Sequence, residues 1–296
     1  MGFIRDITTL FTENQIEFNT LLECIGYTAG IKHVVRLCEK QDTALIIKEV
    51  CERHGLPVLC SRYGLKEAFS TGLSDTFYKI TDINDPQCTR SVLFIGDAEW
   101  TEKAERVEGS GCDAMETAEL YSYPGCCAHN YRLIQQGQYW LDCFLTNATT
   151  GFEFSWKCNK IAYLFAPYLT IFPDYFPCSP SCSGTEKLAS DYEEVLRDYR
   201  MVELLDLIRL HLQGLTLVAG GEVVYIKQFN QVGDDFIVED NHDQLRLRYR
   251  KAGQNILPDR ITRISLQGDL LVVSGPPDKV SQYQTAVSDN RILVFS

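Results

Sequence analysis

Four cysteines in two short segments are the residues of this chain whose type and spacing best suit chemistry. Residues 123–127 read YPGCC and residues 176–182 read FPCSPSC, and each segment begins with an aromatic residue followed by proline. Thiolates are strong ligands of zinc and of iron–sulfur clusters, and they are also nucleophiles in redox reactions. The pattern therefore predicts a metal-binding or redox-active site made by Cys126, Cys127, Cys178 and Cys182.

Both segments are predicted to lie at the start of a helix. Proline suits the first helical turn, so Pro124 predicts a helix that runs to about residue 136. Residues 183–186 (SGTE) form a capping box, which predicts a second helix directly after Cys182. The unpaired N–H groups and the dipole at such a start stabilise a thiolate. We therefore expect two thiolate-favouring turns, about fifty residues apart in sequence, to meet through the fold.

Helical spacing suggests different roles for the neighbouring cysteines. Cys127 is expected on the core face of its helix, whereas Cys126 shares the other side with His129. Cys126 and His129 are therefore the predicted catalytic residues, and all four cysteines are the predicted ligands of a metal or cofactor. Two alternatives stay open for the cysteines: small buried apolar residues, or a metal-free site in which one thiolate attacks and another resolves. For His129 an ordinary structural role is the alternative.

The other cysteines give weaker signals. Cys112 lies in a glycine-rich stretch and is a candidate for an additional ligand. Cys51 is expected at a helix end and Cys60 in a strand, rather than together in a second metal site. Cys143 and Cys158 lie in apolar surroundings and are expected in the core. The chain has no glycine-rich nucleotide-binding motif, no zinc-protease motif and no serine-hydrolase motif.

The cysteine segments also carry a resemblance. Residues 119–127 (ELYSYPGCC), followed by residues 176–182, resemble a sparsely characterised prokaryotic family whose hallmarks are Tyr-Pro-x-Cys-Cys and Pro-Cys-x3-Cys segments. The resemblance covers roughly residues 95–200 and implies no particular reaction. The adjacent cysteines are also similar to the Cys-Cys-Gly segments of heterodisulfide-reductase-like subunits, which ligate iron–sulfur clusters, although here the order is Gly-Cys-Cys.

Composition restricts the partners and the compartment. The formal net charge of -12 argues against general binding to nucleic acid or to an anionic membrane, because few phosphates could be neutralised. The N-terminus has no secretory signal pattern, and the apolar stretch 161–176 is interrupted by two prolines and an aspartate. We expect a cytoplasmic protein whose thiols stay reduced, with a small-molecule substrate or a protein as its partner.

The pattern of elements predicts an α+β fold in two parts. Residues 1–214 alternate helix and strand signals and carry the cysteines, whereas residues 215–296 read as a small antiparallel β module with turns at Gly220-Gly221 and Gly268-Asp269. The expected helices cover 18–40, 43–54, 100–121 and 183–213, the last as one helix or two, and the expected strands include 56–60, 76–83, 91–95, 138–144 and 151–156.

Together these features predict a protein with a cysteine-ligated metal or iron–sulfur centre. The expected activity is redox or sulfur-transfer chemistry on a small molecule, with an iron–sulfur cluster as the cofactor and zinc as its alternative. Two other functions stay open: a non-catalytic binding module that is stapled by zinc, and a metal-free thiol oxidoreductase.

Overall fold

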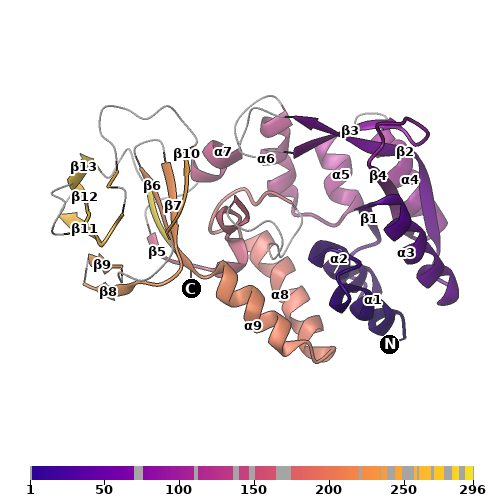
Figure 1. Cartoon of the computed structure of the whole chain (residues 1–296), viewed down its shortest axis with the longest axis horizontal. Coiled ribbons are helices and arrows are strands. Elements are labelled where there is room, and N and C mark those ends of the chain that lie inside the picture. Colours follow the sequence, from indigo (N-terminus) through magenta and orange to yellow (C-terminus); the bar gives the residue numbers. More distant parts are fainter. Residues whose placement is uncertain are drawn as a thin grey trace. The chain divides into compact units, whose positions relative to one another are not determined.

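The structure, a computed structural model, is a mixed α+β protein (Figure 1). It describes residues 2–69, 76–109, 113–135, 140–146, 151–164, 175–219, 222–233, 235–238, 244–248, 257–258, 260–267, 270–276, 282–286 and 291–295. The chain divides into two compact units, and several central segments belong to the second of them. The first unit comprises Met1–Trp140, Ile171–Cys178 and Ser183–Val202, and the second comprises Leu141–Thr170, Ser179–Cys182 and Glu203–Ser296. The domain boundary expected at residue 214 stays a prediction.

The first unit is built on one four-stranded sheet with helices around it (Figure 1). The strand order is β1-β4-β2-β3, and every neighbouring pair is antiparallel. Its strands are β1 (Val34–Glu39), β2 (Val58–Phe69), β3 (Thr76–Asp82) and β4 (Arg90–Gly96). Its helices are α1 (Gly2–Thr12), α2 (Phe18–Thr28), α3 (Gln41–Arg53), α4 (Ala98–Gly109), α5 (Ala114–Leu120), α6 (Gly125–Gln135) and α8 (Ser183–Asp198).

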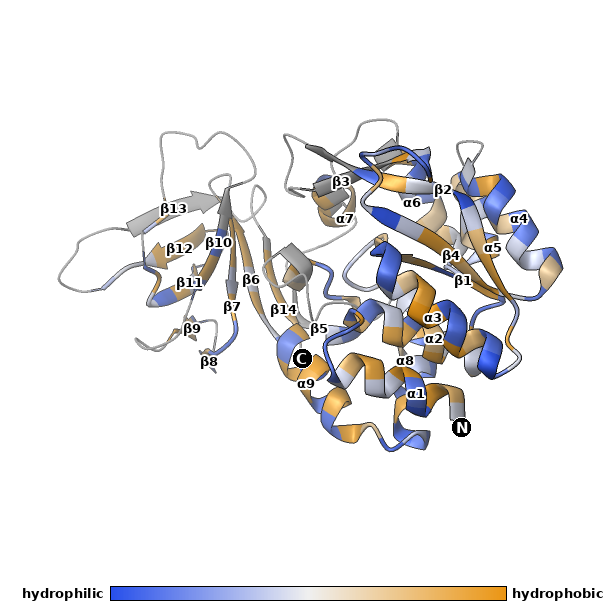
Figure 2. Cartoon of the chain, turned by 45° about the vertical axis from the view of Figure 1, so that its right-hand side comes forward, coloured by the Kyte–Doolittle hydropathy of each residue, from blue (hydrophilic) through white to orange (hydrophobic). Residues whose placement is uncertain are grey.

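Strand β4, which lies inside the sheet between β1 and β2, is buried on both faces from Val92 onward. Val34 and Phe94 pack on one face against Ala104 and Val107 of α4. The alternate residues of the same strands are also fully buried, and α2 and α3 contact β1 and β4. Figure 2 shows the apolar character of these strands. Because both of its faces are covered, β4 is apolar without interruption over residues 92–95, whereas the edge strand β1 carries the exposed Arg36.

The second unit contains two five-stranded sheets that share one hydrophobic core. The first has the order β10-β7-β6-β14-β5 and is antiparallel except that β5 runs parallel to β14; the second has the order β13-β12-β11-β9-β8. This unit contains the helices α7 (Trp140–Thr146) and α9 (Val202–Leu212), except for the first residue of each, which belongs to the first unit. It also contains the short 3-10 helices η1 (Trp156–Cys158) and η2 (Ile161–Leu164). Its strands are β5 (Gly151–Phe154), β6 (Gly214–Ala219), β7 (Glu222–Ile226), β8 (Asn230–Val232), β9 (Asp235–Ile237), β10 (Gln244–Arg248), β11 (Arg263–Gln267), β12 (Leu270–Ser274), β13 (Gln282–Ala286) and β14 (Arg291–Phe295).

The structure confirms the predicted fold class and most elements. The helix expected over 100–121 forms two helices, α4 and α5, and two other expected elements are corrected. The helix expected over 18–40 ends at Thr28, where Gly30 adopts a left-handed φ of 74°, and the chain then forms strand β1. The strand expected over 138–144 is wrong, because α7 is a helix in which Leu141, Phe144 and Leu145 are buried at helical spacing. The pattern over 183–213 forms two helices, and Arg200 between them has a φ of 60°.

Two further expectations concern turns and membranes. The turns expected at Gly220-Gly221 and at Gly268-Asp269 lie outside the described residues. Among the helices that the structure describes, none combines the length and the apolar composition needed to cross a bilayer.

A buried ion pair lies inside the first unit. Lys32 and Glu23 form a salt bridge whose side chains are only 1% and 8% exposed. The Lys32 ammonium also lies 5.0 Å from the ring centre of Tyr123, the residue that precedes Pro124 and the start of α6. Because both charges are largely removed from water, the ion pair stabilises each of them.

Replacement of Lys32 by methionine is expected to lower the free energy of unfolding of the first unit by about 3–5 kcal/mol, because the Glu23 carboxylate would remain buried without the opposite charge of the Lys32 ammonium. Urea denaturation followed by circular dichroism measures the loss. Lys48→Met is the matched control, since Lys48 and Glu52 form an ion pair with exposures of 35% and 54%, and an exposed pair contributes at most about 1 kcal/mol. Equal losses in the two variants would contradict this expectation.

Candidate metal site

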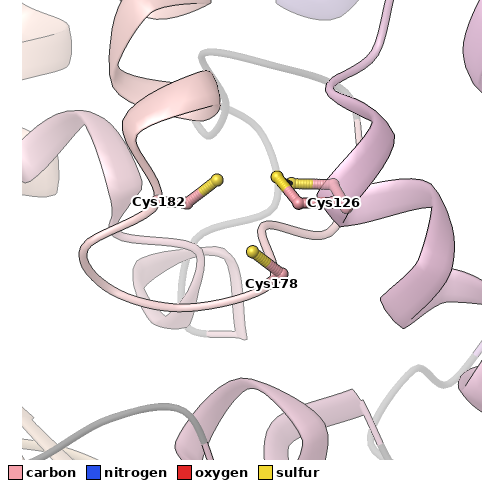
Figure 3. Close-up of side chains that lie close together, drawn as sticks. Cys126, Cys178 and Cys182 are labelled. Carbon is pink, nitrogen blue, oxygen red and sulfur yellow. Dashed lines mark hydrogen bonds between the residues drawn. The ribbon is translucent and has the colours of Figure 1, made fainter.

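The structure brings the four predicted cysteines together. The sulfur atoms of Cys126, Cys127, Cys178 and Cys182 all lie within 4.8 Å of one another. Figure 3 shows the side chains of Cys126, Cys178 and Cys182 pointing toward a common centre. Elsewhere in the described part of the chain, no group of three or more cysteine, histidine or acidic side chains lies close enough to hold a metal ion. The thiol constellation predicted from sequence is therefore a spatial cluster.

The first pair of cysteines lies in the first turn of α6. The helix begins at Gly125, and the N–H groups of Cys127 and Ala128 donate to the carbonyl oxygen of Pro124 at 2.9 and 3.1 Å. Pro124 thus starts the helix as its sequence predicts, with its fixed φ and no N–H to satisfy. The helix ends at Gln135, within one residue of the expected end.

The second pair is presented by a turn that leads into α8. The Cys182 N–H donates to the carbonyl oxygen of Ser179 at 3.3 Å, and α8 begins at the next residue, Ser183. The Cys182 carbonyl oxygen accepts a hydrogen bond from the buried Cys158 thiol at 3.6 Å. Cys158 is therefore a core residue, as expected, and it supports the turn that carries Cys182.

The four sulfurs differ in their access to water. Cys127 and Cys182 are 2% and 4% exposed, Cys178 is half-buried, and Cys126 is exposed. The adjacent sulfurs of Cys126 and Cys127 lie 3.9 Å apart. A thiolate in a buried position carries a desolvation cost, which a bound cation offsets. The cluster thus has a buried side at Cys127 and Cys182 and a solvent-facing side at Cys126.

A polar contact to the buried side was not foreseen from the sequence. The Thr185 hydroxyl oxygen lies 3.5 Å from the Cys127 sulfur, and the Tyr175 hydroxyl donates to the same oxygen at 2.9 Å. Thr185 is fully buried in the first turn of α8. The one available signal was its place within the capping box, three residues after Cys182. Tyr175 carried no signal of this kind.

His129, Cys51, Cys60 and Cys143 are not among the four grouped cysteines. His129 is exposed on α6 and is not a member of the four-ligand group, so its catalytic role stays a prediction. Cys112 lies outside the described residues. Cys51 is buried in α3, where burial raises the pKa of its thiol to about 12, and Cys60 is exposed in β2. Cys143 is buried, as expected for a core residue.

The starts of α6 and α8 approach each other closely at Gly184. A Cβ atom at this position would lie 2.7 Å from the Pro124 Cβ and 3.8 Å from the Cys126 sulfur. The first distance is shorter than real Cβ contacts allow, and the proline ring has little freedom to move. Glycine at position 184 therefore permits the two helix starts to approach within van der Waals contact.

Replacement of Gly184 by alanine is expected to push these helix starts apart, to cost about 1–3 kcal/mol of stability through overpacking and to weaken metal binding. Chelator competition and thermal unfolding measure the two effects. Gly125→Ala is the matched control, because a Cβ at Gly125 would have no neighbour within 4 Å although it also lies at a helix start beside the cysteines. Unchanged metal binding in Gly184→Ala would show that this close approach does not hold the cluster.

Comparison with models of protein families, with curated proteins and with solved structures finds no match for this chain.

Proposed function

We propose that Cys126, Cys127, Cys178 and Cys182 bind one metal ion through their four thiolates. The observation that supports this proposal is the mutual approach of all four sulfur atoms to within 4.8 Å. Four cysteines brought from two distant segments would be an unusual coincidence in a core built only for packing. Their presentation by two helix-start turns also suits ionised sulfur.

The spacing of the sulfurs favours a single ion over a cluster. Tetrahedral coordination with metal–sulfur bonds of about 2.3 Å places neighbouring sulfurs about 3.8 Å apart. The measured 3.9 Å between Cys126 and Cys127 agrees with this spacing, and the 4.8 Å limit on the other pairs is close to it. An iron–sulfur cluster lies between its ligands as several bridged atoms and needs wider separations. Zinc, or a single iron ion, therefore fits better than the iron–sulfur cluster expected from the sequence.

A closed set of four thiolates suits a structural ion or an electron-transfer ion, since a catalytic zinc keeps one coordination position open. On this proposal the ion joins the turn before α8 to the first turn of α6 and stabilises both. The metal would supply strong bonds to thiolates whose burial is otherwise costly.

Redox or sulfur-transfer chemistry on a small molecule is the second candidate function, and the exposure of Cys126 favours it. A solvent-facing thiolate is the ligand that a small molecule or a partner protein would reach first. In this case Cys126 would react or exchange while the two buried cysteines keep the centre in place. His129, exposed on the same helix, is the proposed acid or base for such a step.

Metal analysis of protein purified anaerobically tests the proposal. We expect one equivalent of zinc or iron per chain, and we expect cobalt(II) that replaces it to show the absorption of tetrahedral thiolate coordination. Several irons with acid-labile sulfide and a brown colour would instead support the cluster and the redox reading. The proposed function is refuted if the protein holds no metal after anaerobic purification and after reconstitution with zinc, iron and sulfide. The metal-free thiol site would then be the remaining candidate.

A further inference from the structure

The Thr185 side chain contacts one of the four clustered sulfur atoms. Its hydroxyl oxygen lies 3.5 Å from the sulfur of Cys127, which is the least exposed of the four cysteines. Thr185 is itself fully buried in the first turn of α8, so the backbone of that helix fixes the hydroxyl in place. The contact therefore links the start of α8 to the first turn of α6, beside the proposed ion.

The second contact of Thr185 sets the direction of the hydrogen bonds. Tyr175 donates its hydroxyl hydrogen to the Thr185 oxygen at 2.9 Å. The Tyr175 ring is buried and packs against the ring of Tyr123, with 4.7 Å between their centres. Because Thr185 accepts from Tyr175, its own hydrogen is oriented toward other acceptors. A thiolate is only an acceptor, so in the Thr185–Cys127 pair the hydroxyl must donate.

We propose that Thr185, oriented by Tyr175, is a positioning residue that donates a hydrogen bond to the metal-bound thiolate of Cys127. This inference rests on the proposed metal site. The hydrogen bond would hold the buried sulfur in its ligating orientation and would withdraw part of its negative charge. Hydrogen bonds to ligating atoms orient the ligands and tune the metal, and their loss commonly lowers metal affinity about 10- to 100-fold.

Three substitutions test this role. Thr185→Val removes the hydroxyl at nearly constant volume, and it is expected to lower zinc affinity about 10- to 100-fold in chelator competition. In the cobalt-substituted protein it should also move the sulfur-to-metal charge-transfer band to lower energy, because the sulfur loses a hydrogen bond. Thr185→Ser keeps the hydroxyl and should preserve both the affinity and the band. Tyr175→Phe should cause a smaller loss of affinity, about 2- to 10-fold.

The control is Tyr192→Phe. Tyr192 is a buried tyrosine of α8, and its hydroxyl lies against Gly26. It is expected to leave the affinity and the band unchanged. If the wild-type protein binds zinc and Thr185→Val binds it equally well with an unshifted band, the inference is wrong while the proposed function stands. If the wild-type protein binds no metal, the proposed function itself fails. If Thr185→Val does not fold, the Tyr175→Phe variant provides the test. Zinc affinity and a cobalt charge-transfer band equal to those of the wild-type protein would then overturn the inference.

Discussion

Replacement of Cys182 or Cys127 by serine is expected to lower zinc affinity about 100- to 1,000-fold. Structural zinc sites with four ligands bind with about 10–16 kcal/mol, so one thiolate accounts for about 2.5–4 kcal/mol. Both side chains are nearly inaccessible to water, and water therefore cannot easily take the vacated coordination position. Chelator competition with the purified variants measures the loss, and metal content after dialysis provides an independent readout.

Cysteines outside the cluster provide the controls for this experiment. Cys60→Ser removes an exposed thiol, and Cys51→Ala removes a thiol that is fully buried in α3. Neither variant is expected to change metal content, although Cys51→Ala should reduce stability because it leaves a small cavity. A full equivalent of tightly bound metal in both Cys127→Ser and Cys182→Ser would show that the ion binds elsewhere.

Removal of the metal by a chelator is expected to destabilise the protein strongly. An ion that is present at about 1,000 times its dissociation constant stabilises the folded state by about 4 kcal/mol, provided that the unfolded chain binds it poorly. The largest local effect should occur at the first turns of α6 and α8, which carry or adjoin the ligands. Thermal unfolding followed by circular dichroism, together with hydrogen exchange of these turns, measures the global and the local change.

The variant that lacks all four cluster cysteines is the reference for this experiment. Chelation should leave its thermal midpoint unchanged, because it has no site from which an ion could be removed. Identical midpoints of the wild-type protein with and without chelator, and unchanged hydrogen exchange at α6 and α8, would contradict a structural role for the metal. Readdition of zinc to the chelated wild-type protein should restore the original midpoint.

The elements that sequence predicted well are those with strong local signals. Pro124 starts α6 because a proline lacks the N–H that a first helical turn leaves unpaired, and this depends on no distant contact. Residues 183–186 carry a capping pattern, and α8 begins at Ser183. In the C-terminal part, strand β11 (RISLQ) alternates apolar and polar residues, which is the local pattern of a strand.

The elements that sequence predicted poorly have ambiguous local patterns. β1 continues an apolar series that fits helical spacing, but it pairs along its whole length with β4, a segment more than fifty residues away. Buried and more exposed residues alternate only over residues 35–39 of this strand, and so short a stretch does not outweigh the helical spacing of the apolar residues before it. α7 is a short segment of seven residues, and for such lengths an apolar run fits a helix or a strand equally well.

For the site, the sequence by itself determined the ligand types and the local form of each turn, because proline, capping residues and cysteine spacing act over a few residues. It did not determine that the two turns meet, since that depends on packing between segments about fifty residues apart. The tertiary structure decided that all four sulfurs share one centre, that Cys127 is buried while Cys126 faces solvent, and that Thr185 and Tyr175 lie behind Cys127. The positions and the burial of these side chains depend on close packing and on hydrogen bonds between residues distant in sequence. Local sequence patterns do not contain this information.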